Sequence, residues 1–407
     1  MHRVAVTGLG IVSCLGNDAD TVAGSLRGGR SGIGIDPVRR ELGFLSPLTG
    51  MVRDLDPASV LPKKARKTMP DFAVWAYKAA VDALGMARIS VEELTGDTQT
   101  ALIFGCDSSA VAAVEQTEKL RESRDTAALG SGLVFRSMTS TVTMNLNTLL
   151  GTRGACWSIS SACSSGGHAV GQAADLIRLG RQRRAIAGGA QEINWESMCS
   201  FDGLGAFSKR VDEPERASRP FDAGRDGLVP GGGAAAVVLE RWDDAVARNA
   251  AILGEVLGYG FSSDGGHISV PSEEGIAAAA RMALDQAGRS PADVDYVCAH
   301  ATSTPAGDRA EARNLRLLFP NGTPPVSALK GMTGHELWMS GASQVVYCAL
   351  MARGGFIAKS LNFETPDEDS ARLDIVTETL RRPPEMALLQ AAGFGGTNSC
   401  LLLRFGR

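Results

Sequence analysis

The sequence predicts an α/β protein. Short runs rich in Val, Ile, Leu and Ala end in glycine or small residues and are typical of buried strands, at residues 3–8, 99–105, 184–189, 234–240 and 294–299. Longer stretches of helical period separate them, at residues 71–84, 165–179, 275–287 and 340–351. Strands that alternate with helices favour a sheet covered by helices on both faces.

A weak internal repeat indicates two similar halves. Residues 4–10 (VAVTGLG) resemble residues 254–260 (GEVLGYG), since each is an apolar strand with glycines near its end. The chain has 407 residues, and single cores usually stop growing at ~250–300 residues. We therefore predict an N-terminal half over residues 1–250 and a C-terminal half over residues 251–407. No low-complexity linker separates them, so we expect them to pack as one body.

Composition disfavours several classes of function. With 41 basic and 45 acidic residues the net charge is −4, too weak a field to hold nucleic acid across the surface. A hydrophobic share of 44% and a charged share of 21% are ordinary for a soluble globular protein. No signal-peptide pattern and no run of about 18 apolar residues is present. We expect a cytoplasmic protein that does not enter a membrane.

Cys163 is the first candidate for chemistry. The eight cysteines lack the paired spacing of a zinc site or a disulfide framework, so no metal site is predicted. Cys163 lies in SSACSSGG (residues 160–167), directly before a helical pattern. Unpaired N–H groups and the dipole at a helix start favour a thiolate and lower the thiol pKa. This context alone leaves a nucleophile and a buried structural cysteine equally open.

Two histidines and a glycine-rich turn add to this candidate site. His300 and His335 stand in loops dense in small and hydroxyl residues, AHATSTPAGD (299–308) and KGMTGH (330–335). Such loops commonly carry catalytic groups in α/β folds, and a neutral imidazole can donate a hydrogen bond or move a proton. The turn GFGGTNS (393–399) could present backbone N–H groups to an oxyanion. Together these features favour catalysis at Cys163.

The order of these residues resembles a known family. Cys163, His300, Lys330 and His335, followed by a Gly-Phe-Gly-Gly turn, resemble the β-ketoacyl-[acyl-carrier-protein] synthases, most closely the type I elongating enzymes. The resemblance covers essentially the whole chain and includes TGLGIVS (7–13), FDAGRDG (221–227) and GFIA (355–358). It implies the thiolase fold, a five-layered αβαβα body built from two similar halves.

The resemblance also implies an activity and roles for residues. The activity is decarboxylative Claisen condensation of malonyl-[acyl-carrier-protein] with an acyl chain on Cys163, in fatty-acid or related chain elongation. His300 and His335 are expected to engage the malonyl thioester, while the N–H groups of Cys163 and Phe394 form the oxyanion hole. Lys330 and Glu311 are expected to form an ion pair. Other implied site residues are Gly395 and Gly396 in the turn, Thr302 and Thr304 on the pantetheine arm, and Asp107, Ser108 and Ala392 beside the acyl chain.

Partners follow from the same resemblance. Substrates are carried on the phosphopantetheine of acyl carrier protein, and no other cofactor is expected. Because that carrier protein is acidic, its dock should be basic, and the matching residues are Lys63, Lys64, Arg66 and Lys67, extended by Arg124. A solvated charge run is the alternative interpretation. The family implies a homodimer, and a heterodimer with a chain-length factor is also possible.

Some positions depart from the family pattern. Ala301 stands where glycine is usual and Ala392 where phenylalanine is usual, while residues 336–339 (ELWM) replace a run of small residues. Asp107 and Ser108 replace glycines that are commoner at the end of the acyl pocket. These changes predict an unusual acyl chain, such as a long or polyunsaturated one, with unchanged chemistry.

Three alternatives remain at the level of sequence. One is the ketosynthase of a type II polyketide or aryl-polyene pathway, paired with a chain-length factor. Another is the non-catalytic chain-length-factor-like partner, which lacks the nucleophile, whereas Cys163, His300 and His335 are all present here. A degradative thiolase uses a second cysteine as its base, and this chain has His335 in the corresponding loop.

Overall fold

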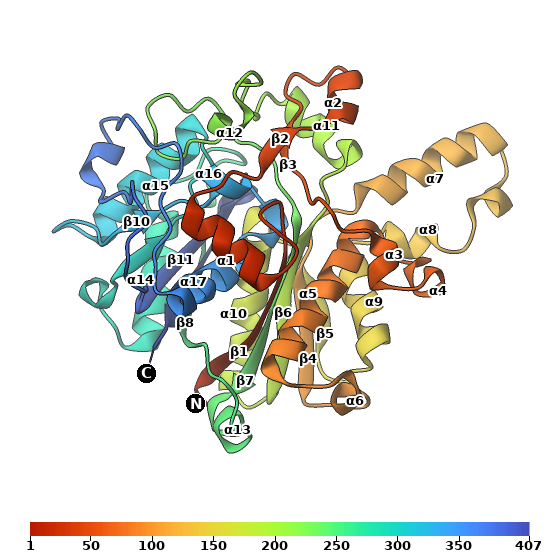
Figure 1. The fold of residues 1–407 in the computed structure, drawn as a ribbon, viewed down its shortest axis with the longest axis horizontal. Helices are drawn as coiled ribbons and strands as arrows, with labels where there is room; N and C mark the ends of the chain where they lie inside the picture. The colour runs from red at the N-terminus through yellow and green to blue at the C-terminus, as the bar shows by residue number, and fades with distance from the viewer. Residues whose placement is uncertain (407) are drawn as a thin grey trace.

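The computed structural model describes residues 1–406, and a sheet of ten strands runs through the molecule (Figure 1). Its strands are β1 (Val4–Val12), β4 (Thr100–Gly105), β5 (Cys156–Ile159), β6 (Arg184–Gln191), β7 (Gly233–Arg241), β8 (Gly254–Ser263), β9 (Tyr296–Cys298), β10 (Val326–Ser327), β11 (Met386–Gly393) and β12 (Thr397–Arg404). Their order is β10-β9-β11-β12-β8-β1-β7-β6-β4-β5. Strands β2 (Ile33–Ile35) and β3 (Leu48–Gly50) form a separate pair.

The large sheet consists of two halves with the same topology. The order β1-β7-β6-β4-β5 in the first half corresponds strand for strand to β8-β12-β11-β9-β10 in the second. In each half the first three strands of this order are antiparallel and the last three are parallel. Only two residue pairs, Ala5 with Glu255 and Val6 with Gly254, join β1 to β8 and thus the two halves. The prediction of an α/β fold with two similar halves is confirmed.

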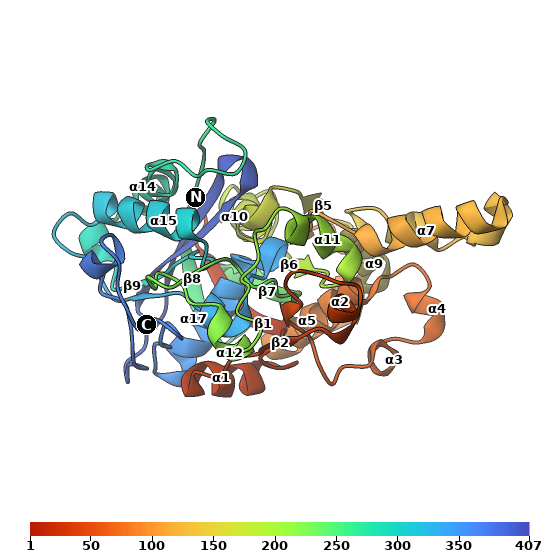
Figure 2. The same ribbon diagram turned by 90° about the horizontal axis from the view of Figure 1, so that it is seen from above.

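Helices complete five layers. Helix α5 (Asp71–Ala87) covers β1 and β7, and α14 (Gly275–Ala287) covers β8 and β12. Helices α10 (Ser165–Arg178) and α17 (Ala342–Gly354) contact each other and both half-sheets, so they form the middle layer (Figure 2). Every residue of α17 from Ala342 to Met351 is buried, as a helix with protein on all sides requires. The helix predicted at residues 340–351 begins two residues later, because Gly341 has a φ of 77°.

The remaining helices lie around this body. Helix α7 projects from it, with α8 beneath (Figures 1 and 2). In the described part of the chain no helix is both long and apolar enough to cross a membrane. The other helices are α1 (Ala19–Gly28), α2 (Pro37–Glu41), α3 (Pro57–Val60), α4 (Lys63–Arg66), α6 (Val91–Leu94), α7 (Ala110–Ser123), α8 (Leu133–Arg136), α9 (Thr141–Leu150), α11 (Trp195–Gly203), α12 (Pro214–Ala217), α13 (Trp242–Ala247), α15 (Pro305–Leu318) and α16 (Lys330–Thr333), with 3-10 turns η1 (Thr126–Leu129), η2 (Ala162–Ser164), η3 (Pro291–Asp293), η4 (Leu337–Met339), η5 (Ser370–Arg372) and η6 (Phe394–Gly396).

The glycines of the internal repeat allow a helix to pack closely on the first strand of each half. A Cβ at Gly10 of β1 would lie 1.8 Å from the carbonyl oxygen of Ala79 in α5. In the second half, a Cβ at Gly260 of β8 would lie 1.9 Å from the carbonyl oxygen of Ala279 in α14. Backbone this close leaves no room for a side chain. The similarity of residues 4–10 to residues 254–260 therefore reflects the same close contact between a helix and the first strand in both halves.

We predict that Gly10→Ala destabilises the protein by about 3 kcal/mol, because the added methyl overpacks a contact between two backbones. The matched control is Gly85→Ala on α5, where a Cβ would meet nothing within 4 Å. Helix propensity there should raise stability by roughly 0.5–1 kcal/mol. Urea unfolding followed by circular dichroism measures both variants, and equal midpoints would contradict the packing argument.

Candidate active site

Cys163 sits where the first half-sheet meets the middle layer. Strand β5 ends at Ile159, the turn η2 carries Cys163, and α10 follows. Hydroxyl groups fix the turn, since Ser164 Oγ donates to the carbonyl of Ser161 at 2.7 Å and Ser165 Oγ donates to that of Ala162 at 2.6 Å. The cysteine side chain is only 6% exposed. This is the strand-to-helix turn that the sequence predicted.

Burial decides the protonation of the Cys163 thiol. It raises the thiol pKa to about 12, while the positive charge of Lys330 and the backbone N–H groups of Cys163 and Phe394 act in the opposite direction. The expectation of a lowered pKa at this helix start was wrong, because desolvation of the thiolate outweighs those favourable contacts. The sulfur is therefore a neutral thiol near pH 7.

His300 and His335 come together from separate loops of the second half. His300 follows β9 and His335 follows α16, and their rings meet edge to face with centroids 5.2 Å apart. Burial, reinforced by the nearby charge of Lys330, lowers the pKa of both imidazoles well below their usual value. Both are therefore neutral near pH 7, and each carries one N–H donor. The Nδ1 atoms are buried without a hydrogen-bond partner in the described residues.

Lys330 and Glu311 hold the backbone at His300 from two sides. Lys330 Nζ donates to the carbonyl oxygen of His300 at 2.5 Å. The carboxylate of Glu311, on α15, accepts from the N–H groups of His300 at 2.7 Å and Ala301 at 2.6 Å. The expected direct ion pair is therefore replaced by two contacts to one peptide segment. Burial raises the pKa of Glu311 to about 7 and lowers that of Lys330.

Glu336 adds a second buried carboxyl group beside Lys330. One of its oxygens accepts from the hydroxyl of Tyr347 at 2.5 Å, and the other accepts from that of Ser343 at 2.6 Å. Burial raises the pKa of Glu336, and the charge of Lys330 opposes that rise. The charges of Glu311 and Glu336 in turn favour the protonated ammonium of Lys330. The sequence showed Glu336 only as a departure from the family pattern.

The glycine-rich turn between β11 and β12 lies against Cys163. A Cβ at Gly393 would come within 2.8 Å of the Cys163 backbone nitrogen, so glycine is required for this approach. Gly395 and Gly396 have φ values of 78° and 73°, a region that glycine adopts without strain. The backbone N–H groups of Cys163 and Phe394 both act to lower the pKa of the Cys163 thiol, so both lie close to the sulfur. Two convergent backbone donors are what an oxyanion hole needs.

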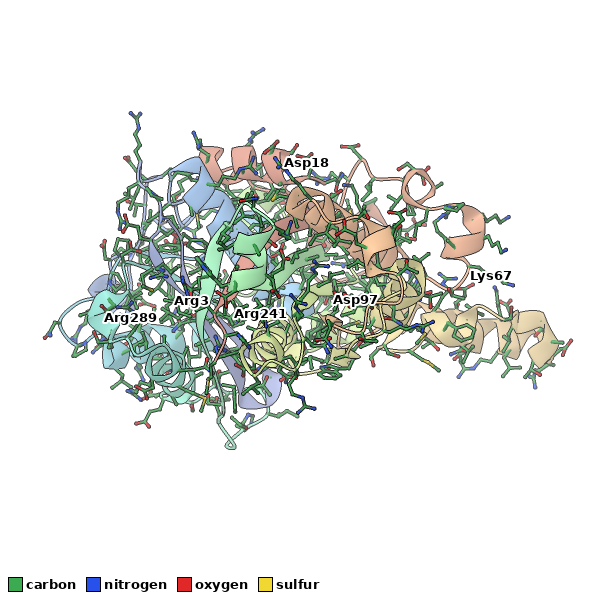
Figure 3. The ribbon with its side chains drawn as sticks, turned by 90° about the horizontal axis from the view of Figure 1, so that it is seen from below. Arg3, Asp18, Lys67, Asp97, Arg241 and Arg289 are labelled. Atoms are coloured by element: carbon green, nitrogen blue, oxygen red, sulfur yellow. The ribbon has the colours of Figure 1, made fainter. Side chains whose placement is uncertain are left out.

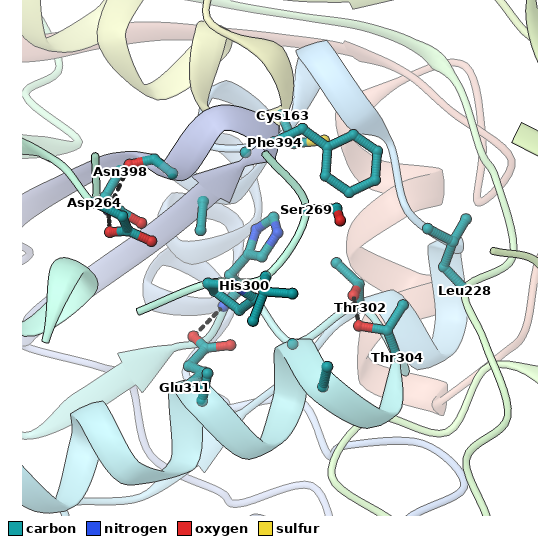
Figure 4. A pocket seen from close by; sticks show the side chains of 18 of the residues that line it. Cys163, Leu228, Asp264, Ser269, His300, Thr302, Thr304, Glu311, Phe394 and Asn398 are labelled. Carbon is teal, nitrogen blue, oxygen red and sulfur yellow. Dashed lines mark hydrogen bonds between the residues drawn. The ribbon is translucent and has the colours of Figure 1, made fainter. Parts of the chain in front are cut away.

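Most of the predicted catalytic and substrate-binding residues line one cavity of about 280 Å³ (Figure 4). They are Cys163, His300, Thr302, Thr304, Glu311, His335, Ala392, Phe394 and Gly396. A hydrogen bond of 3.0 Å connects the hydroxyl groups of Thr302 and Thr304. Lys330 and Gly395 do not line the cavity but adjoin residues that do. No three His, Cys, Asp or Glu side chains among residues 1–406 are grouped so that they could hold a metal ion.

Other lining residues were missed in the sequence. Phe201, Leu228 and Leu337 line the cavity, and so do Asp264 and residues 267–272. The polar, glycine-containing segment SDGGHISVPS gave a usable signal, because such loops at strand ends often carry function. Phe201, Leu228 and Leu337 gave no such signal, since nothing in their local sequence distinguishes the wall of a pocket from the ordinary core.

Asp107 and Ser108, predicted beside the acyl chain, do not line this cavity. Both follow β4, and their side chains are engaged elsewhere. The Ser160 hydroxyl donates to Asp107, while the Ser108 hydroxyl donates to Glu192. Burial raises the pKa of Asp107. These hydrogen bonds hold both residues at the strand end rather than in the cavity wall.

Comparisons with known proteins agree with this geometry. The model of the β-ketoacyl synthase N-terminal domain matches residues 1–245, and that of the C-terminal domain matches residues 253–364. The 3-oxoacyl-[acyl-carrier-protein] synthase 1 of Escherichia coli (strain K12) is 39% identical over 406 residues, 99% of each chain. A β-ketoacyl synthase structure from Burkholderia phymatum STM815 is 32% identical, with a TM-score of 0.94 and complete coverage of both chains. A chain in the structure of a type II PKS acyl-carrier protein in complex with its ketosynthase, bound to the hexaketide, is 27% identical, with a TM-score of 0.90 and complete coverage of both chains.

Two half-sheets of the same topology, with a buried thiol beside one and paired imidazoles beside the other, define a condensing enzyme of the thiolase fold. The predicted fold is thereby confirmed. Within that class, the chain belongs to the β-ketoacyl synthase family, since the two domain models and the full-length relative cover almost all of it. It is an acyltransferase that condenses acyl units, as the resemblance implied.

We predict that alkylation of Cys163 by iodoacetamide accelerates about tenfold per pH unit from pH 7 to 9.5 without reaching a plateau. Below its pKa a thiol gains thiolate in that proportion, and burial holds the pKa of Cys163 far above this range. Peptide mass mapping measures the rate at this residue. The same protein unfolded in guanidinium is the control, where a rate that levels off near pH 8.5 is expected. An alkylation rate that levels off in the folded protein would contradict a pKa of Cys163 raised by desolvation.

Proposed function

We propose that this enzyme condenses malonyl-[acyl-carrier-protein] with an acyl chain held on Cys163, with loss of carbon dioxide, to give β-ketoacyl-[acyl-carrier-protein]. The observation that carries the proposal is the convergence of one thiol, two neutral imidazoles and two backbone N–H donors in one buried cavity. The name of the E. coli relative supports the choice of carrier-bound acyl substrates. In this scheme residues 1–250 supply the nucleophile, and residues 251–407 supply the histidines and the glycine-rich turn.

The first half-reaction transfers the acyl chain to the enzyme. The sulfur of Cys163 attacks the thioester carbonyl of acyl carrier protein, the new S–C bond forms, and the bond to the pantetheine sulfur breaks. The thiol proton leaves Cys163 and ends on the released pantetheine thiol. The N–H groups of Cys163 and Phe394 stabilise the tetrahedral oxyanion, a role that is worth about 10²–10³ in rate per donor.

The second half-reaction forms the new carbon–carbon bond. Malonyl thioester loses carbon dioxide, and the electron pair of the broken bond becomes an enolate. Neutral imidazole N–H groups of His300 and His335 stabilise the enolate oxygen, since both rings are buried and their electrostatic interactions are strong there. The enolate carbon attacks the acyl carbonyl on Cys163, the S–C bond breaks with its electron pair going to sulfur, and the resulting thiolate takes a proton from water to restore the thiol. Lys330 and Glu311 act by positioning His300 through its backbone.

The hydroxyl groups of Thr302 and Thr304 stand in the cavity beside His300 and are the proposed contacts of the phosphopantetheine arm. That arm belongs to the carrier protein, and the proposed mechanism uses no further cofactor. The structure of a carrier protein in complex with its ketosynthase supports acyl carrier protein as the partner. We place the reaction in the cytoplasm, where we expect the enzyme to encounter acyl carrier protein.

We predict that Cys163→Ala abolishes acylation, whereas His300→Ala keeps acylation and loses condensation by about 10²–10³. The enzyme is incubated with acyl carrier protein loaded with acyl and malonyl groups. Intact mass then follows the acyl-enzyme and the β-ketoacyl product separately. Acyl mass that persists in Cys163→Ala would contradict the assignment of Cys163 as the nucleophile. Equal loss of both steps in His300→Ala would place this histidine in the first half-reaction instead.

Basic residues on α4 form the proposed dock for the carrier protein. Lys63, Lys64 and Lys67 are exposed, and Arg66 is half-buried with its guanidinium donating to the carbonyl of Leu61. The group lies at the end of the molecule from which α7 projects (Figure 3). Arg124, at the end of α7, is the fifth predicted residue of the dock and is also exposed.

We predict that Lys63→Glu combined with Lys64→Glu raises the KM for acyl carrier protein at least tenfold and leaves kcat little changed, because opposite charge is lost at the encounter surface. The matched control is Arg289→Glu, which changes an exposed charge at the opposite end of the molecule (Figure 3). Initial rates at low ionic strength measure both variants. An equal rise in KM for the control would mean that net charge, rather than a dock, governs the encounter.

A homodimer is the proposed assembly. Strand β5 is the last strand of the sheet order and leaves one edge open, with Trp157 on it 40% exposed. Open edges with apolar side chains favour pairing with another chain. Exposed apolar side chains on and near α7 and α8 extend this surface: Leu120, Val134, Phe135 and Met138.

A ketosynthase of a type II polyketide or aryl-polyene pathway, paired with a chain-length factor, is the second candidate function. The similarity to a ketosynthase that is described as bound to a hexaketide favours it. The reaction steps at Cys163 would be the same. A non-catalytic partner is disfavoured, since the nucleophile and both histidines share one cavity.

A further inference from the structure

An apolar cluster that includes Cys163 encloses one side of the catalytic cavity. Four members besides Cys163 line the cavity: Phe201, Ala206, Leu228 and Leu337. An acyl chain bound to the sulfur has to occupy such apolar space, because its methylene groups are stabilised by leaving water. This cluster is therefore the wall that the acyl chain meets.

Three further members of the cluster lie behind that wall. Met198, Phe207 and Trp338 pack in the same cluster as Cys163 but do not line the cavity. Phe201 connects the two layers, since its ring contacts those of Phe207 at 6.3 Å and Trp338 at 6.5 Å on the buried side. The same ring stacks at 6.1 Å on Phe394, which is 41% exposed. Phe394 thus lies on the exposed side of Phe201, and Phe207 and Trp338 lie on its buried side, which we call the closed end of the cluster.

Trp338 has the largest side chain at the closed end, and its backbone packs tightly against α10 and β6. It is 6% exposed and lies in the turn η4. A Cβ at either Gly166 of α10 or Gly189 of β6 would lie 2.9 Å from the carbonyl oxygen of Trp338. Both glycines therefore let the turn approach the helix and the sheet. The preceding Glu336 is fixed in turn by its two hydroxyl partners.

We propose that Trp338 sets the upper length of the acyl chain that Cys163 accepts, by filling the apolar space in which a longer chain would lie. The proposal rests on the proposed function and names its substrate class as short acyl chains. It reverses the expectation of a long chain. The space gained at Ala392 belongs to the open cavity, whereas Trp338 occupies the closed end. A packed interior does not open for extra methylene groups without strain.

The test compares acylation of Cys163 by carrier-bound saturated chains of four to sixteen carbons. Trp338→Ala should raise the ratio of kcat/KM for long over short chains by at least tenfold, since each newly accommodated methylene is worth roughly fourfold. Trp338→Phe is the matched control, because it keeps an aromatic ring at the closed end and should keep the wild-type ratio. Intact mass gives the acylation rates without the condensation step.

An unchanged chain-length ratio in Trp338→Ala, with short chains still accepted, would overturn the proposal and leave the proposed function standing. Wild-type enzyme that gains no acyl mass from any chain would instead overturn the proposed function. If Trp338→Ala does not fold, as thermal unfolding would show, Trp338→Leu provides the same comparison with a smaller cavity. A wild type that already prefers sixteen carbons over six would also contradict a short pocket.

Discussion

Removal of water from the junction between the two half-sheets is the constraint on which the chemistry depends. It raises the pKa of Cys163 and Glu311 and lowers the pKa of His300 and His335, so the cavity holds a neutral thiol and neutral imidazoles. The ammonium of Lys330 is the exception, supported by nearby carboxyl groups. Neutral donors in a dry cavity stabilise a developing oxyanion or enolate more strongly than they would in water.

The duplicated topology explains why these groups meet. Counted along the chain, the second and third strands of the large sheet in each half, β4 with β5 and β9 with β10, are parallel, so their carboxyl ends lie at the same edge of the sheet. Cys163 follows the third strand of the first half, and Lys330 and His335 follow the third strand of the second. His300 follows β9, which corresponds to β4, the strand that precedes Asp107. Equivalent positions thus carry different chemistry in the two halves.

Catalysis and chain selection are assigned to different parts of one cavity. The donors come from backbone N–H groups and imidazoles, whose positions are fixed by hydrogen bonds to buried groups such as Glu311. The acyl side is built from apolar contacts around Phe201 and Trp338. Changes of side-chain volume on that side alter which chain fits without moving a donor. The departures in residues 336–339 can therefore change the substrate while the reaction is retained.

The sequence alone determined the strand and helix pattern, the repeat at Gly8–Gly10 and 258–260, and the turn that carries Cys163, because these follow from local periodicity and from glycine where backbones touch. The tertiary structure decided what depends on contacts between distant segments. It reversed the sign of the pKa shift at Cys163, since burial is not visible in a local pattern. It replaced the expected Lys330–Glu311 pair by two contacts to the backbone at His300. It also placed Trp338 behind the apolar wall of the cavity, because only packing distinguishes a pocket wall from the core behind it.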